Sequence, residues 1–207
     1  MYVPKPYQEH RQDVLLDAIR ARSFGTLISE NDGRIELTHI PFAVTEIEGR
    51  VHLVAHLARA NGHWRTIDES REVVVSFLVD DGYISPSWYP SKAETGKVVP
   101  TWNYVAIEAR GRPRIIDDAC GLLRLVELLT DRHESERSAP WSTDDAPTEF
   151  TAALLNHIVG IEIGIETLTG AWKLDQKKKA PDRRGASTGL SHEPRGKSLS
   201  MLMSASG

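Results

Sequence analysis

The sequence predicts a mostly antiparallel β-barrel with short helices at both ends of its sheet. Two observations support this fold class: six or seven strand-like segments follow one another along the chain, and helices do not alternate with them as they would in a parallel α/β fold. The chain has 207 residues, of which 40% are hydrophobic and 26% are charged. That length and composition suffice for one globular domain with a substantial core.

The domain is expected to span residues 1–177. Beyond it Gly, Ser, Lys, Arg and Pro dominate and no periodicity remains, so residues 178–207 are expected to form a basic, flexible tail. Residues 177–207 contain seven Lys or Arg against two acidic residues, a net charge of +5, which leaves residues 1–176 with −9. An acidic body repels a nucleic-acid backbone, so any DNA contact would come from a local patch or from the tail.

The first half of the predicted sheet follows an amphipathic helix. Apolar residues recur at helical spacing through residues 8–22, with charges on the other face. Strands are then expected at residues 24–29 and 35–44, joined by the Asp-Gly pair at 32–33, which tolerates the positive φ of a hairpin turn. Pro41 cannot donate to a ladder and therefore indicates an edge strand or a bulge.

Three further strands are expected in the middle of the chain. Residues 51–56 and 98–116 alternate between two faces, whereas residues 72–79 form an apolar, β-branched run that is typical of a central strand covered on both sides. A short helical connection is expected at residues 64–68. Prolines and aromatic residues at 83–90 indicate an irregular segment, which a polar loop follows.

The last part of the domain returns to helices before the sheet closes. A stripe of leucines and a valine through residues 118–132 predicts one helix, and a second is expected at residues 148–158, with Pro147 in its first turn. The polar, Pro-rich stretch between them is expected to be a loop. Residues 160–166 alternate cleanly and supply the closing strand.

The chain is expected to be cytoplasmic. Its first residues lack an apolar signal core, and no stretch approaches the roughly 18 consecutive apolar residues of a membrane-spanning helix. The single cysteine, Cys120, cannot form an internal disulfide, and we expect it to pack in the core rather than act as a nucleophile.

Several common ligand-binding motifs are missing from the sequence. It contains neither G-x-G-x-x-G after a strand nor G-x-x-x-x-G-K-S/T, so nothing supports a dinucleotide fold or a P-loop. His39, His52, His56 and His63 are close in sequence but lack an i, i+4 helical pair or a C-x-x-C partner, which disfavours a zinc site. Partly buried or surface histidines are the simpler interpretation, and no metal is expected.

A candidate anion site follows the strand at residues 51–56. Arg59 supplies a fork of cationic donors and Asn61 an amide beside exposed backbone N–H groups, which is what a phosphate monoester requires. Flat aromatic residues recur in three clusters, at 88–89, 102–104 and 172. A phosphate contact with aromatic walls suits a phosphorylated planar ligand such as flavin mononucleotide (FMN). The alternative is an aromatic core with surface charges.

Seven short segments stand out in order along the chain: M-Y-V-P at residues 1–4, T-H-I-P-F at 38–42, H-L-A-R-A-N at 56–61, Y-I-S-P-S-W-Y at 83–89, V-P-T-W-N-Y at 99–104, P-W at 140–141 and V-G-I-E-I at 159–163. Together they resemble the PaiB-like family of FMN-binding negative transcriptional regulators over about residues 1–177. The resemblance implies an antiparallel FMN-binding split β-barrel related to pyridoxamine-phosphate oxidase, a homodimer, and FMN held in the cleft between the subunits.

The same resemblance implies a set of cofactor-binding residues. They are Thr38, His39, Ile40, His56, Arg59, Ala60, Asn61, Trp102, Asn103, Tyr104, Lys173 and Gln176. Of these, Arg59 and Asn61 would hold the phosphate, residues 38–40 would line the flavin, and residues 102–104 would form a wall. The family usually has K-L-S-Q-N and G-H-x-A-R-A-N-P-Q-W. Here Asp175 replaces the serine, Ala55 replaces the first glycine, and Gly62-His63 replace Pro-Gln, so no cofactor contact is expected at Asp175.

Two functions agree with the resemblance. The first is an FMN-binding homodimeric negative transcriptional regulator, with the flavin as a structural or redox-sensing ligand and DNA as the partner, although no helix-turn-helix is evident. The second is an FMN-dependent oxidoreductase, a flavin reductase or oxidase, in which the cofactor supplies the ring chemistry and His39 or His56 could tune it. Whether the protein is an enzyme stays open at this point, as does a third role as a dimeric ligand-binding protein.

Overall fold

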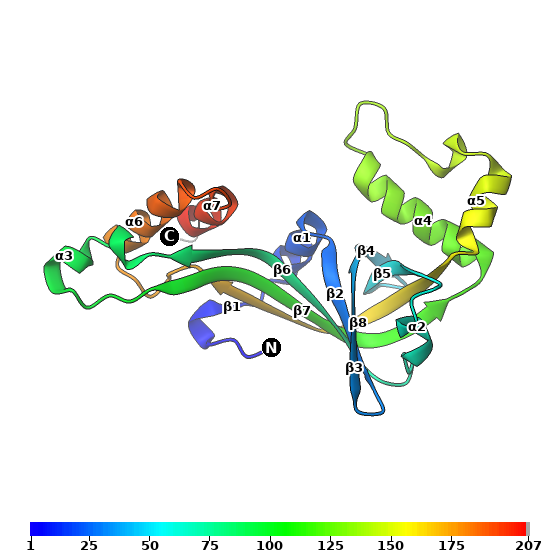
Figure 1. Ribbon diagram of the computed structural model, residues 1–207, viewed down its shortest axis with the longest axis horizontal. Coiled ribbons are helices and arrows are strands. Elements are labelled where there is room, and N and C mark those ends of the chain that lie inside the picture. Colours follow the sequence, from blue (N-terminus) through cyan, green and yellow to red (C-terminus); the bar gives the residue numbers. More distant parts are fainter. Residues whose placement is uncertain (206–207) are drawn as a thin grey trace. The chain divides into compact units, whose positions relative to one another are not determined.

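The computed structural model describes residues 1–205 and contains one eight-stranded β-sheet with flanking helices (Figure 1). Seven strands are ordered β3-β2-β6-β7-β8-β5-β4, and the short β1 pairs with β8. The neighbouring pairs whose register is defined, such as β2 with β3 and β5 with β8, are antiparallel. The predicted fold class is confirmed, and the sheet stays open at β3 and β4.

The strands are β1 (Gln8–Glu9), β2 (Phe24–Asn31), β3 (Arg34–Pro41), β4 (Ala43–Ile47), β5 (Arg50–Ala58), β6 (Val73–Ile84), β7 (Thr101–Ile116) and β8 (Ile158–Lys173). The helices are α1 (Gln12–Ala21), α2 (His63–Thr66), α3 (Ser91–Thr95), α4 (Ala119–Glu134), α5 (Thr148–Leu155), α6 (Ala180–Ser191) and α7 (Lys197–Ala205). Single 3-10 turns lie at Lys5–Tyr7, Pro86–Trp88 and Thr143–Asp145. Within residues 1–205, no helix combines the length and the apolar character that a membrane span needs.

The chain divides into two compact units. Unit 1 contains residues 1–15, residues 78–107 and the described residues from 169 onward, and unit 2 contains residues 16–77 and 108–168. This division does not follow the boundary at residue 177 that the sequence suggests. Each unit is therefore described by itself.

Unit 2 is built on two hairpins. Strands β2 and β3 pair from Phe24↔Pro41 to Asn31↔Arg34, around a turn in which φ is 49° at Asp32 and 77° at Gly33. These left-handed angles suit glycine and, less readily, aspartate, which explains why the Asp-Gly pair predicts the turn correctly. Strands β4 and β5 form the second hairpin, from Ala43↔Val54 to Ile47↔Arg50.

Pro41 marks the point at which the chain changes partner strand. Residues 35–44, predicted as one strand, belong to two: β3 ends at Pro41 and pairs with β2, whereas β4 begins at Ala43 and pairs with β5. Pro41 has no N–H for a ladder. The next N–H, that of Phe42, donates to the carbonyl of Ser23 at 2.8 Å. The proline therefore marks a strand break, and the strand that it ends, β3, lies at the edge of the sheet as the sequence predicts.

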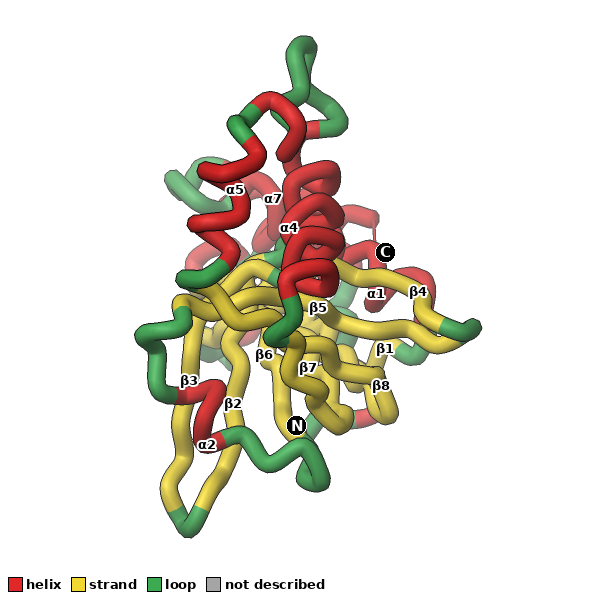
Figure 2. The backbone as a smooth tube through the Cα atoms, turned by 90° about the vertical axis from the view of Figure 1, so that its right-hand side faces the viewer, coloured by secondary structure: helices red, strands yellow, loops and turns green. Residues whose placement is uncertain are grey.

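Helix α4 packs over β5 in unit 2, and Figure 2 shows it lying directly above that strand. The predicted stripe is buried, with Leu122 and Leu125 in one apolar cluster with Val54 and Ile116. Cys120 lies off this stripe and is exposed. The expectation that Cys120 packs in the core is wrong, because the helix turns that position away from the sheet.

The strand predicted at 72–79 forms part of β6, which continues in unit 1 through an Asp-Asp-Gly segment that looks like a turn in the sequence. The glycine is Gly82, and a Cβ there would lie 3.0 Å from methyl groups of both Leu190 and Leu199. The lack of a side chain thus lets α6 and α7 pack against β6. The loop expected at residues 92–97 begins instead with a helix, because residues 92–95 belong to the short helix α3.

The tail predicted at residues 178–207 contains two helices. Residues 206 and 207 lie outside the described residues, but α6 and α7 contribute Ala186, Leu190, Leu199 and Met203 to a buried cluster in unit 1. The sequence hides this because α6 is rich in glycine and serine, a composition typical of flexible segments. In the structure a Cβ on Gly189 would lie 2.3 Å from the ring of Trp88, so its small size serves close packing.

Candidate functional site

Four polar side chains form a chain of hydrogen bonds in unit 2. Asn61 Nδ2 donates to Thr38 Oγ1 at 3.1 Å, Thr38 Oγ1 lies 2.8 Å from His63 Nδ1, and His63 Nε2 lies 2.8 Å from Ser29 Oγ. The four residues come from β2, β3 and the segment around the start of α2. Two of them, Thr38 and Asn61, are among the residues that the resemblance assigns to the cofactor. We call the four residues the Thr38–His63 cluster.

Local geometry explains how Asn61 reaches this position. The N–H of His63 donates to Asn61 Oδ1 at 3.0 Å, which is an Asx-type turn, and the N–H of Asn61 donates to the carbonyl of Ala58 at 2.8 Å. These two bonds fix the chain where it leaves β5. The amide of Asn61 is thereby oriented before any ligand arrives, and its second N–H remains as a further donor.

His63 sits at the centre of the cluster and is 2% exposed. Burial lowers the pKa of its imidazole, while nearby Glu36 acts in the opposite direction. The ring is therefore neutral at pH 7, so one ring nitrogen donates and the other accepts. The sequence gives little warning of this role, because His63 looked like one of four scattered histidines. The signal that could have found it is the replacement of Pro-Gln by Gly62-His63 in an otherwise matching segment.

His63 gives the first testable prediction, which concerns pH. Its pKa is lower in the folded state than the ordinary value near 6.5, so the unfolded chain binds the proton more readily. The free energy of unfolding is therefore expected to fall as the pH drops below about 6.5. Urea unfolding at pH 8.0 and 5.5 measures this. His63→Gln should flatten the dependence while His10→Gln should not, and an equal slope in all three proteins would contradict the assignment.

The Arg59 guanidinium bonds protein groups, whereas the sequence suggests that it binds a phosphate. Its Nε donates to the carbonyl of Asn156 at 2.8 Å, and its Nη2 donates to the carbonyl of Ile158 at 2.9 Å and to the carboxylate of Asp117. The guanidinium holds the pKa of Asp117 below its usual range. Trp64 adds to this arrangement, since its indole N–H donates to the Arg59 carbonyl at 3.0 Å. Arg59 thus joins the end of β5 to the start of β8.

The neighbours of Thr38 on β3 point in opposite directions. Ile40 shares the face of Thr38 and is 8% exposed, as the alternation of a strand requires. His39 is on the other, exposed face, where its Nδ1 lies 2.9 Å from Thr26 Oγ1 and its ring stacks on Phe24 at a centroid distance of 6.4 Å. Residues 38–40 therefore cannot all line one ligand surface within unit 2.

His56 and Ala60 flank Arg59 without joining the Thr38–His63 cluster. Ala60 is exposed in the turn after β5. His56 is half-buried under α4, beside a shallow pocket that also includes Leu129, His133 and Trp141. Burial lowers the pKa of His56, and its Nδ1 has no hydrogen-bond partner among residues 1–205. The structure therefore places His56 in a separate part of unit 2.

The predicted aromatic wall lies in unit 1. Trp102 is 55% exposed and meets Tyr83 edge-on at 6.1 Å between ring centroids. Tyr104 is half-buried on the same face of β7. Asn103 points the other way: it is fully buried, and its Nδ2 donates to Met203 Sδ at 3.6 Å. Trp102 and Tyr104 can line a flat ligand, whereas Asn103 belongs to the core of unit 1.

Lys173 and Gln176 hold the end of β8 in unit 1. Lys173 Nζ donates to Thr101 Oγ1 at 2.6 Å and to the carbonyl of Trp102, and burial lowers the pKa of its ammonium group. Gln176 Oε1 accepts from the N–H of Leu174 at 2.8 Å. Both side chains thus already have hydrogen-bond partners within unit 1.

Asp175 is a structural residue that the sequence did not identify. It is 6% exposed, it has a left-handed φ of 62°, and it accepts a hydrogen bond from the Tyr89 hydroxyl at 3.0 Å. Burial and this carboxylate raise the pKa of Tyr89 well above its usual range. The carboxylate that replaces the family's serine therefore has a partner of its own. Among residues 1–205, no group of three His, Cys, Asp or Glu could hold a metal ion.

The open antiparallel sheet defines the class of protein as a split barrel. Residues 1–167 match the family model described as "Putative FMN-binding domain", and the chain belongs to this family. The family assignment supports a flavin cofactor.

Relatives agree with this assignment over most of the chain. Protease synthase and sporulation protein PAI 2 of Bacillus subtilis is 28% identical over 205 residues, which covers 98% of this chain and 96% of that protein. Among solved structures, the FAD and heme binding protein from Mycobacterium smegmatis has a TM-score of 0.60 at 20% identity and covers 86% of this chain and 78% of that one. The flavocytochrome Anf3 from Azotobacter vinelandii has a TM-score of 0.55 at 14% identity, with 85% and 74% covered. These two structures share the fold.

Proposed function

We propose that the protein is an FMN-binding homodimer that acts as a negative transcriptional regulator, and that the Thr38–His63 cluster holds the flavin phosphate. The observation that carries the phosphate site is the hydrogen-bond chain itself. It fixes the hydroxyl of Thr38 on β3 and the amide of Asn61 after the end of β5, and both kinds of group can bond phosphate oxygens. Because the groups are already oriented, a bound phosphate would cost little side-chain entropy.

The residues fit a flavin phosphate in part. Asn61 has one N–H left after its bond to Thr38, and the Thr38 hydroxyl proton is free to point at a ligand when His63 Nδ1 is the protonated nitrogen. Arg59 fits less well, because three of its N–H bonds are used within unit 2 and only its Nη1 remains for a phosphate. The bound flavin would supply redox chemistry, and the protein would orient it.

The sharpest test of the phosphate site is Asn61→Asp, compared with FMN and riboflavin. The variant keeps the acceptor for the His63 N–H but puts a carboxylate beside the phosphate, so we expect FMN affinity to fall at least tenfold. Riboflavin has no phosphate, and its affinity should change little. Flavin fluorescence titration measures both. Asn31→Asp, at the end of β2, is the matched control.

Two results would overturn the phosphate assignment. One is an equal loss of FMN and riboflavin affinity in Asn61→Asp, which would mean that the variant damages the fold. The other is wild-type protein that takes up no FMN, as judged from its visible spectrum before and after the cofactor is added. The second result would also remove the flavin from the proposed function.

The dimer is proposed from an apolar surface on the β2–β3 hairpin. Phe24, Ile35 and Leu37 are 65%, 72% and 59% exposed, and their register places them on one face of the hairpin with His39. Exposed apolar side chains grouped in this way are typical of an interface. Sedimentation equilibrium tests this proposal directly, and a monomeric mass for wild-type protein at micromolar concentration would contradict it.

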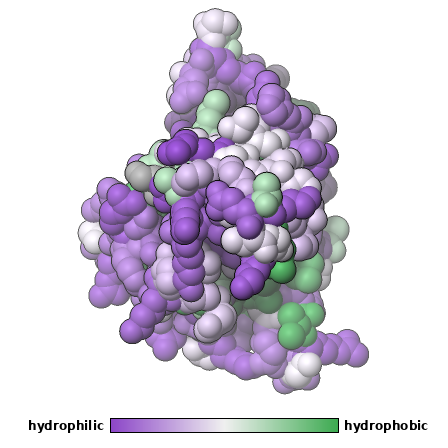
Figure 3. Space-filling model, turned by 90° about the vertical axis from the view of Figure 1, so that its left-hand side faces the viewer, coloured by the Kyte–Doolittle hydropathy of each residue, from purple (hydrophilic) through white to green (hydrophobic). Residues whose placement is uncertain are grey.

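Repression requires a surface for DNA, and the basic segment at residues 177–197 offers one. Two of its lysines are fixed on unit 1, with Lys177 Nζ 5.5 Å from the ring centroid of Tyr7 and Lys178 Nζ 4.5 Å from that of Tyr89. Figure 3 shows that the surface on this side, where α3 and α6 lie in Figure 1, is largely hydrophilic. Lys and Arg side chains neutralise DNA phosphates, so this group of cations is a candidate surface for DNA.

A mobility-shift experiment tests the DNA contact. We expect Arg183→Glu together with Arg184→Glu to weaken promoter binding at least tenfold and to reduce its salt dependence, because two cations are lost. Arg132→Glu together with Arg137→Glu, in unit 2, is the control of equal charge. Wild-type binding no stronger than that to unrelated DNA at physiological salt, with FMN present and absent, would refute repression by direct contact.

A second candidate function is an FMN-dependent oxidoreductase. The observation in its favour is His39, a titratable side chain that shares an exposed face with the ring of Phe24 and is therefore accessible to a planar ligand. Anaerobic addition of NADH or NADPH to the flavin-loaded protein tests it. Bleaching of the flavin absorbance would favour the oxidoreductase, and an unchanged spectrum with both nucleotides would remove its main support.

A further inference from the structure

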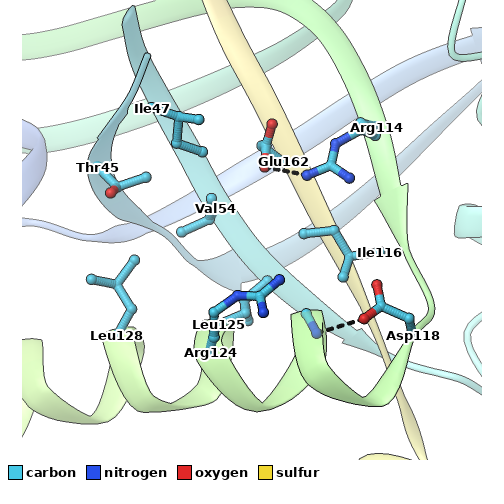
Figure 4. A pocket seen from close by; sticks show the side chains of 11 residues that line it. Thr45, Ile47, Val54, Arg114, Ile116, Asp118, Arg124, Leu125, Leu128 and Glu162 are labelled. Carbon is cyan, nitrogen blue, oxygen red and sulfur yellow. Dashed lines mark hydrogen bonds and ion pairs between the residues drawn. The ribbon is translucent and has the colours of Figure 1, made fainter. Parts of the chain in front are cut away.

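Unit 2 contains a cavity of about 400 Å³, and none of the predicted cofactor-binding residues lines it (Figure 4). It lies between α4 and the strands β4, β5, β7 and β8. Its volume is at the low end of the range for ligand pockets, about 300–1,000 Å³. No residue of the Thr38–His63 cluster lines it.

One side of the cavity is apolar. Val54 from β5, Ile116 from the end of β7 and Leu125 from α4 are 4%, 7% and 4% exposed, and Leu128 extends the same wall along the helix. Figure 4 shows these side chains facing one another across the space between helix and sheet. A wall of this kind favours a compact hydrocarbon body, because its burial removes apolar surface from water.

Both carboxylates at the cavity already have partners. Glu162, whose side chain is 12% exposed, accepts from Arg114 Nη2 at 2.7 Å and lies 3.2 Å from His52 Nδ1. Asp118 Oδ1 accepts from the N–H of Gly121 at 2.7 Å and caps α4. These groups are satisfied and are not available to neutralise a further cation.

Arg124 is the charged group that remains. Its guanidinium points from α4 into the space between helix and sheet (Figure 4). Within residues 1–205 its hydrogen bond is from Nη1 to Cys120 Sγ at 2.7 Å, and no carboxylate pairs with it. A thiol is a weak acceptor. The planar fork of Arg124 therefore has donors free for a ligand, and a carboxylate matches that fork geometrically.

We propose that this cavity binds a small monocarboxylate with a compact apolar body. Its carboxylate would bond the guanidinium of Arg124, and its hydrocarbon part would pack on Val54, Ile116 and Leu125. A dianion such as phosphate fits less well, because Glu162 and Asp118 lie at the same cavity and would repel the second charge. This ligand site is independent of the proposed flavin function.

Benzoate is a suitable probe, with benzamide as its neutral counterpart of the same shape. We expect benzoate to shift the NMR signals of Val54, Ile116 and Leu125 in a saturable way, and benzamide to bind at least tenfold more weakly. Arg124→Gln should weaken benzoate at least tenfold and leave benzamide unchanged. The matched control is Arg112→Gln, an exposed arginine of unit 2 that pairs with Glu166 and does not line the cavity.

A second variant tests the cavity independently, in case Arg124→Gln loses binding because it misfolds. Thr45→Phe places a ring from β4 into the cavity and should abolish benzoate binding while the urea unfolding midpoint stays near that of wild type. The proposal is refuted if benzoate causes no saturable shift, if benzamide binds as tightly, or if Arg124→Gln binds benzoate normally. Displacement of bound FMN by benzoate would also overturn it, because the cavity would then belong to the flavin. FMN titration of the same samples reports separately on the flavin site.

Discussion

Ending the chain after Lys178 is expected to unfold unit 1 rather than remove a loose tail. The truncation deletes α6 and α7, and with them Leu190, Leu199 and Met203, which are at most 2% exposed. Burial of a side chain of this size contributes roughly 2 kcal/mol. Three of them sum to about 6 kcal/mol, which is comparable with the whole stability of an ordinary domain.

Two tryptophans report separately on the folding of the two units. Trp88 packs against Gly189 of α6, so its near-ultraviolet circular dichroism should disappear on truncation. Trp64 lies in unit 2 and donates to Arg59, so its signal should persist if unit 2 stays folded. Trp88→Phe and Trp64→Phe variants assign the two signals.

Point variants in α6 provide the matched control. Leu190→Ala removes a buried side chain and should lower the free energy of unfolding by about 2–5 kcal/mol, whereas Thr188→Ala on the exposed face should change it by less than about 0.5 kcal/mol. If the truncated protein shows the wild-type urea midpoint and an intact Trp88 signal, the helices do not support unit 1. The sequence-based expectation of a tail would then be right after all.

The fold class was predictable because local signals and the global sheet agree. The Asp-Gly turn at 32–33, the leucine stripe of α4 and the alternation of β7 all follow from spacing within a few residues. Two of the failures share one physical cause, namely a residue type with two uses. Gly189 suggests a flexible segment in the sequence, but in the structure it allows close packing against Trp88. Gly82 suggests a turn, but in the structure it allows helices to pack against a strand.

The candidate site could be predicted only where neighbours in sequence are neighbours in space. Thr38 and Asn61 fall in two segments that the resemblance identifies, whereas His63 lies just beyond one of them and is not among the predicted site residues. Ser29 could not be found, because its link to His63 spans 34 residues and depends on the pairing of β2 with β3. The partners of Arg59 were hidden for the same reason, since Asn156 is 97 residues away.

Replacing Arg59 with alanine is expected to lower the free energy of unfolding more than replacing Asp117 does, because the carbonyls of Asn156 and Ile158 lose a charged donor. Asp117→Asn tests the ion pair alone and should cost less than about 1 kcal/mol, since the Asp117 side chain is 50% exposed. Arg59→Lys keeps the charge but cannot reproduce the three directed bonds, so it should lie closer to the alanine variant than to wild type.

The same three variants separate an anchoring Arg59 from one that binds phosphate. An anchor predicts that urea midpoints fall in the order Asp117→Asn, Arg59→Lys, Arg59→Ala, with FMN affinity falling only as far as riboflavin affinity does. A phosphate contact through Nη1 predicts a loss for FMN alone, which Arg59→Lys partly restores because the cation is retained. Wild-type midpoints together with a selective loss of FMN would refute the anchoring role. A single contact through Nη1 would leave the pair with Asp117 intact, whereas a two-pronged contact that includes Nη2 would require Arg59 to leave Asp117 when the cofactor binds.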